Sequence, residues 1–390
     1  MDFRLNDEQK MMIESARQIG ERFGLDYWRK QDAAKAFRAD YWRAVCDAGL
    51  CGVALPTEHG GSGLGMMEMS LIVEGLAATG GGSTVGQLFM INPIFGGVSI
   101  SRFGNERMRA ELLPKIISGE INCCMALTEP DAGTNTLEIT SFAAADGDGW
   151  RLNGRKIWIT GVESAAKMLV IARTKKVSES SSRTDGLSMF MIDVKREGLG
   201  HTPIDKLGTC TLDSSSVFFD NVRIEPDELI GTLHRGWREL LDVLNTERIV
   251  TTAGLVGTGE LAVRLAVDYA NERKVFGDRP ISAYQGLQFP LAQCHVEVEA
   301  ARLLNHKAAT NFDMGLPYGS EANAAKLLAA QAVARATERA MQTMGGMGYA
   351  KEYHVERLWR DCRLFRFAPV SEEMILNYVA NHDLKMPRSY

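Results

Sequence analysis

Apolar residues recur at helical spacing along the first third of the chain. In "LNDEQKMMIESARQIGERF" they run from Met12 to Phe23 on one face, and Asn6 or Asp7 can cap the start of that helix. "DYWRAVCDAGL" and "MEMSLIVEGLAATG" continue the pattern on either side of the glycine-rich "PTEHGGSGLG". We therefore expect this part to be helical, with its glycines in a tight connector.

Helical spacing returns in the last third. From Gly236 the sequence "WRELLDVLNTERIVTTAGLVGTGELAVRLAVDYANERKVFG" can hold a helix of many turns, in which the small residues of "GLVGTG" suit close helix packing. The alanine-rich "EANAAKLLAAQAVARATERAMQTM" strongly favours helix and stops at "GGMG", where Gly345 can take the left-handed capping conformation. Long helices of this kind predict a four-helix packing.

The period changes in the middle of the chain, where short β-rich runs alternate with polar turns. "KMLVIART", "GLSMFMIDV" and "SSVFFDNVRI" are such runs, and "KKVSESSSRTDG" is a polar loop. In "GWRLNGRKIWITG" the pair Asn153-Gly154 predicts a hairpin turn. The predicted order is a helical domain at 1–120, a β domain at 121–232 and a helical domain at 233–390.

Composition narrows the class of protein. The 390 residues carry a net charge of −5, so no basic field favours nucleic acid, and we find no apolar run long enough to span a bilayer. The seven cysteines are scattered without CxxC pairs, and the seven histidines never reach HExxH spacing. We expect a cytoplasmic protein with reduced thiols and no catalytic metal.

Three stretches together indicate a binding site that none of them would establish alone. The turn in "CMALTEPDAGTNT", residues 124–136, can offer N–H groups and hydroxyls to a phosphate, although it could equally be only a well-made turn. In "RKIWITG", Trp158 and Thr160 share a strand face, which would give a flat heteroaromatic cofactor a stacking surface and a hydrogen-bond donor. In "QTMGGMGYAKEYHVERLWRD", residues 342–361, the glycines permit close approach to the backbone, or simply end a helix.

In this order and at these separations, the stretches resemble the acyl-CoA dehydrogenase family of flavoproteins. "ALTEPDAGTN" resembles the first family signature, "WITG" the flavin-stacking strand, and residues 342–361 the second signature; "NERKVFG" is a typical Glu-Arg-x-x-Phe-Gly run. The resemblance spans essentially the whole chain. It implies a mainly α fold with a central β domain: N-terminal helices, a β-barrel-like middle domain and a C-terminal four-helix bundle.

The resemblance also implies non-covalent FAD, held by two groups of residues. The proximal group matches positions that contact the flavin and pyrophosphate, and comprises Leu127, Thr128, Gly133, Thr134, Trp158 and Thr160. The distal group matches positions that a neighbouring subunit supplies to the ADP half, and comprises Arg273, Phe276, Gln285, Gln342, Gly345 and Gly346. Thr134 and Arg248 match substrate-binding positions. Such sharing predicts a homo-oligomer, either a dimer or a tetramer.

The residue that should take a proton from the substrate is missing from its usual place. Most members carry a Glu followed by Gly and Thr or Ser shortly after an Arg-Asp pair, but here Pro369 stands there, and Glu372 and Glu373 come about a helical turn later. Some branches of the family carry the base as a Glu-Arg pair early in the first long C-terminal helix. "LNTERIV" places Glu247 there, and we predict it as the base, although a helix glutamate is most often solvated.

The predicted activity is therefore an FAD-dependent conversion of an acyl-CoA to its 2,3-enoyl-CoA. An electron-transfer flavoprotein is the electron acceptor that the resemblance implies. Because the usual glutamate is absent, two alternatives stay open. One is a flavin-bound relative that performs enoyl-CoA reduction or an elimination, and the other is a non-catalytic partner subunit of an active paralogue.

Overall fold

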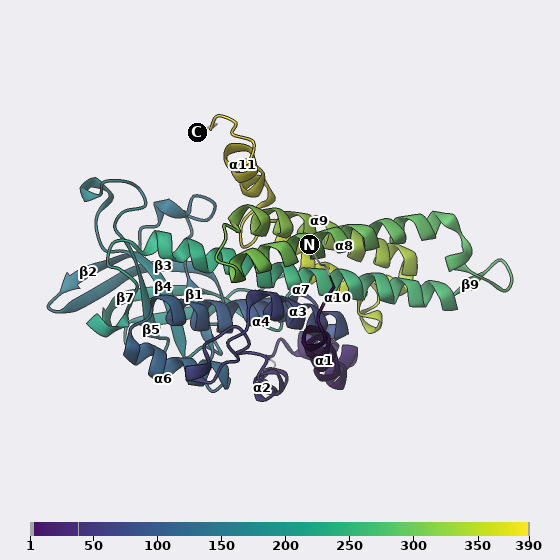
Figure 1. Cartoon of the computed structure of the whole chain (residues 1–390), viewed down its shortest axis with the longest axis horizontal. Helices are drawn as coiled ribbons and strands as arrows, with labels where there is room; N and C mark the ends of the chain where they lie inside the picture. The colour runs from purple at the N-terminus through teal and green to yellow at the C-terminus, as the bar shows by residue number, and fades with distance from the viewer. Residues whose placement is uncertain (1–3, 38, 389–390) are drawn as a thin grey trace.

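The computed structural model describes residues 4–37 and 39–388, and it has the predicted order of helices, sheet and helices (Figure 1). The strands of the large sheet gather at one end of an elongated molecule, and the long C-terminal helices extend to the other end. This arrangement confirms the predicted fold class, which is mainly α with a central β domain. The two ends carry different residues that the sequence analysis assigns to the cofactor site.

Helices and two π-helical segments form the N-terminal part. They are α1 (Asp7–Ala34), α2 (Ala39–Asp47), α3 (Met66–Leu76), η2 (Ala77–Gly81), α4 (Ser83–Phe89), η3 (Met90–Val98), α5 (Ser99–Phe103) and α6 (Glu106–Ile117). Asn6 caps α1 by accepting a hydrogen bond from the Gln9 backbone N–H at 2.8 Å, and the helix kinks at Gly24, where φ is 66°. The π-helical segments η2 and η3 are notable because such segments are frequent at functional sites.

The middle of the chain forms one eight-stranded sheet. Its strands are β1 (Cys123–Ala126), β2 (Phe142–Asp146), β3 (Gly149–Thr160), β4 (Lys167–Arg173), β5 (Leu187–Asp193), β6 (Leu199–Pro203), β7 (Ser214–Ile224) and β8 (Leu229–Ile230). Their order is β6-β7-β3-β2-β4-β5-β8, and β1 pairs with β4 in parallel. The buried faces of β4 and β5 join this sheet to the core of the N-terminal helices.

The predicted hairpin turn at Asn153-Gly154 is wrong. Both residues lie inside β3, where the pairing with β7 shifts between Leu152 and Gly154. The Asn153 side chain accepts a hydrogen bond from the Asn221 backbone N–H at 2.9 Å, so it serves the sheet and not a turn. The β2–β3 hairpin instead turns at Gly147, whose φ is 63°.

Long helices form the C-terminal part, as predicted. They are α7 (Gly236–Glu272), α8 (Gln285–Asp313), α9 (Gly319–Met344), α10 (Val355–Arg363) and α11 (Glu372–His382), with a small hairpin of β9 (Lys274–Val275) and β10 (Arg279–Pro280) after α7. By length and composition α7 could cross a membrane, which the sequence analysis did not anticipate. However, 78% of its apolar window is buried inside the protein, where it packs on α3, α4, α8 and α9.

Glycines let α7 approach its neighbours closely. A Cβ atom on Gly254 would lie 2.9 Å from the Cα of Gly86 on α4, and one on Gly257 would lie 2.5 Å from the carbonyl oxygen of Glu74 on α3. The predicted role of "GLVGTG" in helix packing therefore holds. The segments α4 and η3 thus both pack on α7, and Glu247 lies in the first half of that helix.

Candidate active site

Glu247 occupies an unusual position for a glutamate. It lies on the fourth turn of α7, only 1% of its surface is exposed, and neither carboxylate oxygen has a hydrogen-bond partner among the described residues. Buried polar atoms are nearly always paired, because an unpaired one loses its hydration without replacement. An orphaned buried carboxylate therefore indicates a group that awaits a ligand or a proton.

The surroundings of Glu247 favour its protonated form. Burial raises the pKa of Glu247 to about 7, because the charged carboxylate loses its hydration there. The positive charges of Arg248 and Lys326 act in the opposite direction and are the smaller effects. A carboxyl group that titrates near neutral pH is suited to accept and release a proton.

The turn around Pro369 holds no free carboxylate to compete for this role. Glu372, the nearest buried acid, receives hydrogen bonds from the Arg366 guanidinium at 2.7 and 2.8 Å, which holds the pKa of its carboxyl below the ordinary value. Glu373 is exposed on the first turn of α11. The missing glutamate has therefore not simply moved a few residues along the chain.

Trp158 is held in a conformation that indicates a ligand. Its φ of 62° lies in the left-handed region, at a point where the β3–β7 pairing shifts between Lys156 and Ile159. That conformation costs roughly 1–2 kcal/mol for a residue other than glycine. The indole is nevertheless 54% exposed, while its neighbour Ile159 is buried and Thr160 is half-buried. The sheet thus presents an exposed indole two residues before a half-buried hydroxyl group.

The turn after β1 is fastened to the same part of β3. The buried Lys156 ammonium donates to the Leu127 carbonyl at 2.8 Å and to the Glu129 carboxylate at 2.9 Å. One residue further, the Ile157 backbone N–H donates to the Thr128 carbonyl at 2.9 Å. These bonds join Leu127 and Thr128 of the proximal group to the part of β3 that leads to Trp158 and Thr160.

The end of that turn is open. A Cβ atom built on Gly133 would have no atom within 4 Å, and Gly133 and Thr134 are both exposed. The turn therefore leaves room for a phosphate or ring edge to lie against its backbone. Together with the exposed Trp158, this arrangement fits the FAD that the resemblance implies.

Helices α4 and α7, which pack on each other, contain further orphaned polar atoms. Buried side-chain oxygens without a described partner belong to Ser83, Thr84 and Gln87 on α4 and to Thr251 and Thr252 on α7. Thr251 follows Glu247 by one helical turn, and the Nε of Arg248 is also buried without a partner in the part of the chain that the structure describes. The sequence analysis did not single out these hydroxyls and amide. Their only sequence signal is a cluster of small polar residues within strongly apolar helices.

The segment η3 connects Glu247 to the flavin-binding edge. It contacts α7 on one side and β1 on the other, and a Cβ atom on Gly161, directly after Thr160, would lie 3.0 Å from the Ile91 side chain. The helix that carries Glu247 and the strand that precedes the turn of the proximal group therefore contact the same segment.

The distal group lies elsewhere on the chain. Arg273, Phe276 and Gln285 surround the β9–β10 hairpin, and Gln342, Gly345 and Gly346 end α9. All six are exposed, Phe276 by 97%. The hairpin and the sheet lie at opposite ends of the molecule (Figure 1). One chain therefore does not bring its proximal and distal groups together.

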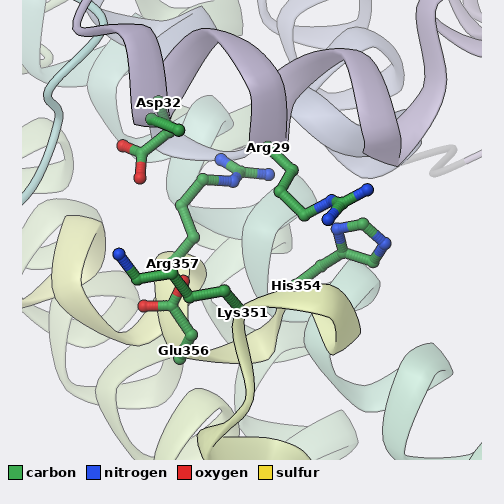
Figure 2. Close-up of a pocket in the computed structure, with 7 residues that line it drawn as sticks. Arg29, Asp32, Lys351, His354, Glu356 and Arg357 are labelled. Carbon is green, nitrogen blue, oxygen red and sulfur yellow. The ribbon is translucent and has the colours of Figure 1, made fainter.

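A cavity of about 130 Å³ lies apart from these residues, between α1 and the start of α10 (Figure 2). It is lined by Arg29, Asp32, Ala33, Lys351, His354, Glu356 and Arg357. Asp32 and Glu356 both pair with Arg360, and Arg29 pairs with Asp26. Because its lining includes neither Glu247 nor any member of the proximal and distal groups, we assign the cavity no part in the reaction.

Comparisons with known proteins agree with this geometry. Models of the N-terminal, middle and C-terminal domains of acyl-CoA dehydrogenases match residues 6–120, 124–222 and 234–383. Acyl-CoA dehydrogenase FadE12 of Mycobacterium tuberculosis is 39% identical over 370 residues, which cover 94% of each chain. The 3-(aryl)acrylate reductase of Clostridium sporogenes is 32% identical over 356 residues, which cover 91% of this chain and 92% of the reductase.

A solved structure gives the same result for the fold. The glutaryl-CoA dehydrogenase in complex with glutaryl-CoA superposes with a TM-score of 0.95 at 30% identity, covering 100% of this chain and 98% of that one. The predicted family and cofactor are therefore confirmed, and the exposed Trp158 and the open turn at Gly133 fit the flavin. The chain belongs to the acyl-CoA dehydrogenase family, and its cofactor is FAD.

Proposed function

We propose that this protein dehydrogenates an acyl-CoA thioester to its 2,3-enoyl-CoA, with Glu247 as the base. One observation carries the proposal: a carboxylate buried to 1% exposure, with both oxygens unpartnered, on the helix that faces the bridging segment η3. A structural carboxylate in this position would be paired, and a solvated one would be exposed. Glu247 is neither.

In this proposal Glu247 takes the proton from the α-carbon of the thioester. The proton moves to a carboxylate oxygen of Glu247. Because this oxygen has no hydrogen-bond partner among the described residues, no existing bond must break before it accepts the proton. Donors near the thioester carbonyl would stabilise the negative charge that develops on its oxygen. Thr134 and Arg248, whose Nε has no described partner, are the proposed substrate-binding residues.

The bound flavin supplies the redox chemistry by accepting the hydride that leaves the β-carbon. Trp158 would stack on that cofactor, the Thr160 hydroxyl would donate a hydrogen bond to it, and the turn of Gly133 and Thr134 would hold its phosphates. The buried walls formed by α4 and α7 exclude water from Glu247, which keeps its pKa near neutral.

We also propose that the protein works as a homo-oligomer and passes electrons to an electron-transfer flavoprotein. Exposure of the whole distal group, and the position of its hairpin at the opposite end of the molecule from the sheet, support a second copy that completes each cofactor site.

The test is anaerobic reduction of the bound flavin by a panel of saturated acyl-CoA thioesters, followed by absorbance. Glu247→Gln keeps the size of the side chain but removes the base, and we expect it to slow reduction by about 10²–10⁴-fold. Glu373→Gln, a change in an exposed glutamate near the vacated turn, is the matched control and should reduce at the rate of the parent protein. Rapid reduction in Glu247→Gln would show that the base lies elsewhere.

Similarity to the 3-(aryl)acrylate reductase supports a second candidate function, the reduction of an unsaturated acyl group. The same samples separate the two. A reductase would leave its oxidised flavin unchanged with every saturated thioester, and its chemically reduced flavin would be reoxidised by an enoyl or arylacryloyl substrate.

A further inference from the structure

Lys326 is a buried lysine that the reaction described above does not use. It lies on α9 with 0% of its surface exposed. Its ammonium donates hydrogen bonds to the carbonyl oxygens of Phe365 at 2.6 Å and Val370 at 2.7 Å. These two carbonyls lie on either side of Pro369, so Lys326 closes the turn from which the usual glutamate is missing.

The same ammonium lies near Glu247. Helices α7 and α9 pack along each other, and the charges of Lys326 and Glu247 interact favourably. An ammonium has three N–H donors, and two of these are directed to Phe365 and Val370. No direct ion pair joins Lys326 to Glu247, so the carboxylate gains a nearby positive charge while its oxygens stay free.

The other charges around this pair are few. Arg248 comes from α7 itself, and Glu372 and Glu373 come from α11, where Glu372 is held by Arg366. The segments α4 and η3, which also pack on α7, contain no charged residue. On α3, which also packs on α7, Glu74 is paired with Arg302 and His306 of α8.

A buried lysine is costly, and its retention here needs a reason. Burial lowers the pKa of Lys326 to about 8, which still leaves it mostly charged at neutral pH. A neutral donor such as glutamine could satisfy the two carbonyls without the cost of a buried charge. The hydrogen bonds to the two carbonyls therefore do not explain why Lys326 carries a charge.

We propose that Lys326 is a positioning residue for the base: its ammonium fastens the Phe365–Val370 turn beside the substrate site and keeps a positive charge near Glu247, so that the carboxylate is available to accept a proton. This inference rests on the proposed function. Lys326 acts through Glu247 and through the turn, and it does not touch the reacting atoms.

Three variants separate the two roles. Lys326→Met removes the charge and the donors, Lys326→Gln removes the charge but keeps an N–H donor, and Lys326→Arg keeps both. Arg335→Met is the matched control, because it removes a positive charge from the exposed side of the same helix, where Arg335 pairs with Glu297. All are studied as FAD-loaded protein.

The primary readout is the titration of the Glu247 carboxyl by infrared difference spectroscopy, with the band identified by its loss in Glu247→Gln. Loss of the nearby cation should move the midpoint upward by about one pH unit in Lys326→Gln and Lys326→Met. The midpoint should stay in place in Lys326→Arg and Arg335→Met. Hydrogen exchange in residues 365–371 should quicken most in Lys326→Met, because two buried carbonyls then lose their donor.

An unchanged midpoint in Lys326→Gln would overturn the proposal, and this variant decides the matter even where Lys326→Met does not fold. The titration needs no substrate, so it is independent of the proposed reaction. If Glu247→Gln still reduces flavin with an acyl-CoA, the assignment of the base fails even though the midpoint shift is observed. If the midpoint does not shift but Glu247→Gln abolishes reduction, the proposed function stands and the role of Lys326 fails.

Discussion

At the scale of single residues, the burial of Glu247 links the proposed chemistry to stability. The pKa of Glu247 is about 7 in the folded chain, above the ordinary value of 4.5. Between these two values the folded chain binds more protons than the unfolded chain, so the contribution of Glu247 to stability falls as pH rises. Ionised Glu247 therefore destabilises the fold above neutral pH.

Replacing Glu247 should remove this pH dependence. We expect Glu247→Gln to gain stability relative to the parent protein on going from pH 5 to pH 8, by up to about 3 kcal/mol, since each pKa unit corresponds to about 1.4 kcal/mol. The measurement is the difference in thermal midpoint between the two FAD-loaded proteins at each pH. Glu373→Gln should follow the parent protein at both values, and an equal gap for Glu247→Gln at pH 5 and pH 8 would show that Glu247 ionises normally.

The sequence predicts the identity of these residues better than their surroundings. Glu247 and Trp158 follow from short local patterns, "TER" and "WITG". The burial of Glu247, the strained φ of Trp158 and the role of Lys326 depend on segments far away in the chain. Lys326 bonds to residues about forty positions later, and nothing in "AAKLLAA" indicates where those carbonyls lie.

At the scale of elements, the contact between α4 and α7 should tolerate no added atom. A Cβ atom on Gly254 would lie 2.9 Å from the Gly86 Cα, which is backbone and cannot rotate away. Overpacking of about 1–3 kcal/mol should outweigh the roughly 0.5–1 kcal/mol that alanine gains over glycine in a helix. We expect Gly254→Ala to lower the thermal midpoint.

The matched control for that prediction is Gly286→Ala, at the start of α8. A Cβ atom there would have no atom within 4 Å, so this change should leave the midpoint unchanged or raise it slightly. Equal effects of the two substitutions would contradict the close packing of α4 on α7.

The sequence predicted helices and strands correctly where one hydrophobic period ran for many residues. It failed where contacts with distant segments determined the local structure. The long patterns of α7 and α9 were sufficient to identify both helices. Asn153-Gly154 has the sequence of a turn, but cross-strand bonding to Asn221 keeps it within β3. The π-helical form of η3 has no simple period, and it depends on α7 and the sheet that pack on either side.

At the scale of the whole molecule, the cofactor site is divided between the two ends of the chain. The sheet with Trp158 lies at one end and the hairpin with Phe276 at the other (Figure 1). Phe276 is 97% exposed, with a positive φ of 49°, and this combination is costly for an isolated chain. A second copy that places its distal group against the cofactor would explain both features.

Subunit complementation tests this arrangement. Gly346→Leu should fold, because a Cβ atom there meets nothing within 4 Å in the chain, but its side chain should block the cofactor of the neighbouring subunit. Glu247→Gln should disable only its own subunit. In a mixed dimer, the Gly346→Leu chain keeps its own Glu247 and receives the intact Gly346 of the Glu247→Gln chain, so this site is complete. The other site carries both changes. Random co-assembly should therefore restore about a quarter of the parent activity, although each variant alone is inactive.

The control places both substitutions in one chain, so that every site of its oligomer carries both changes and activity stays absent. The measurement is acyl-CoA-dependent flavin reduction after co-expression, with the assembly mass determined on the same sample. A mixed oligomer without activity would mean that the distal group serves no neighbouring site. Activity in Gly346→Leu alone would mean that the end of α9 does not approach the cofactor. Restored activity requires that each site draws residues from two chains, because neither chain alone retains both functional groups.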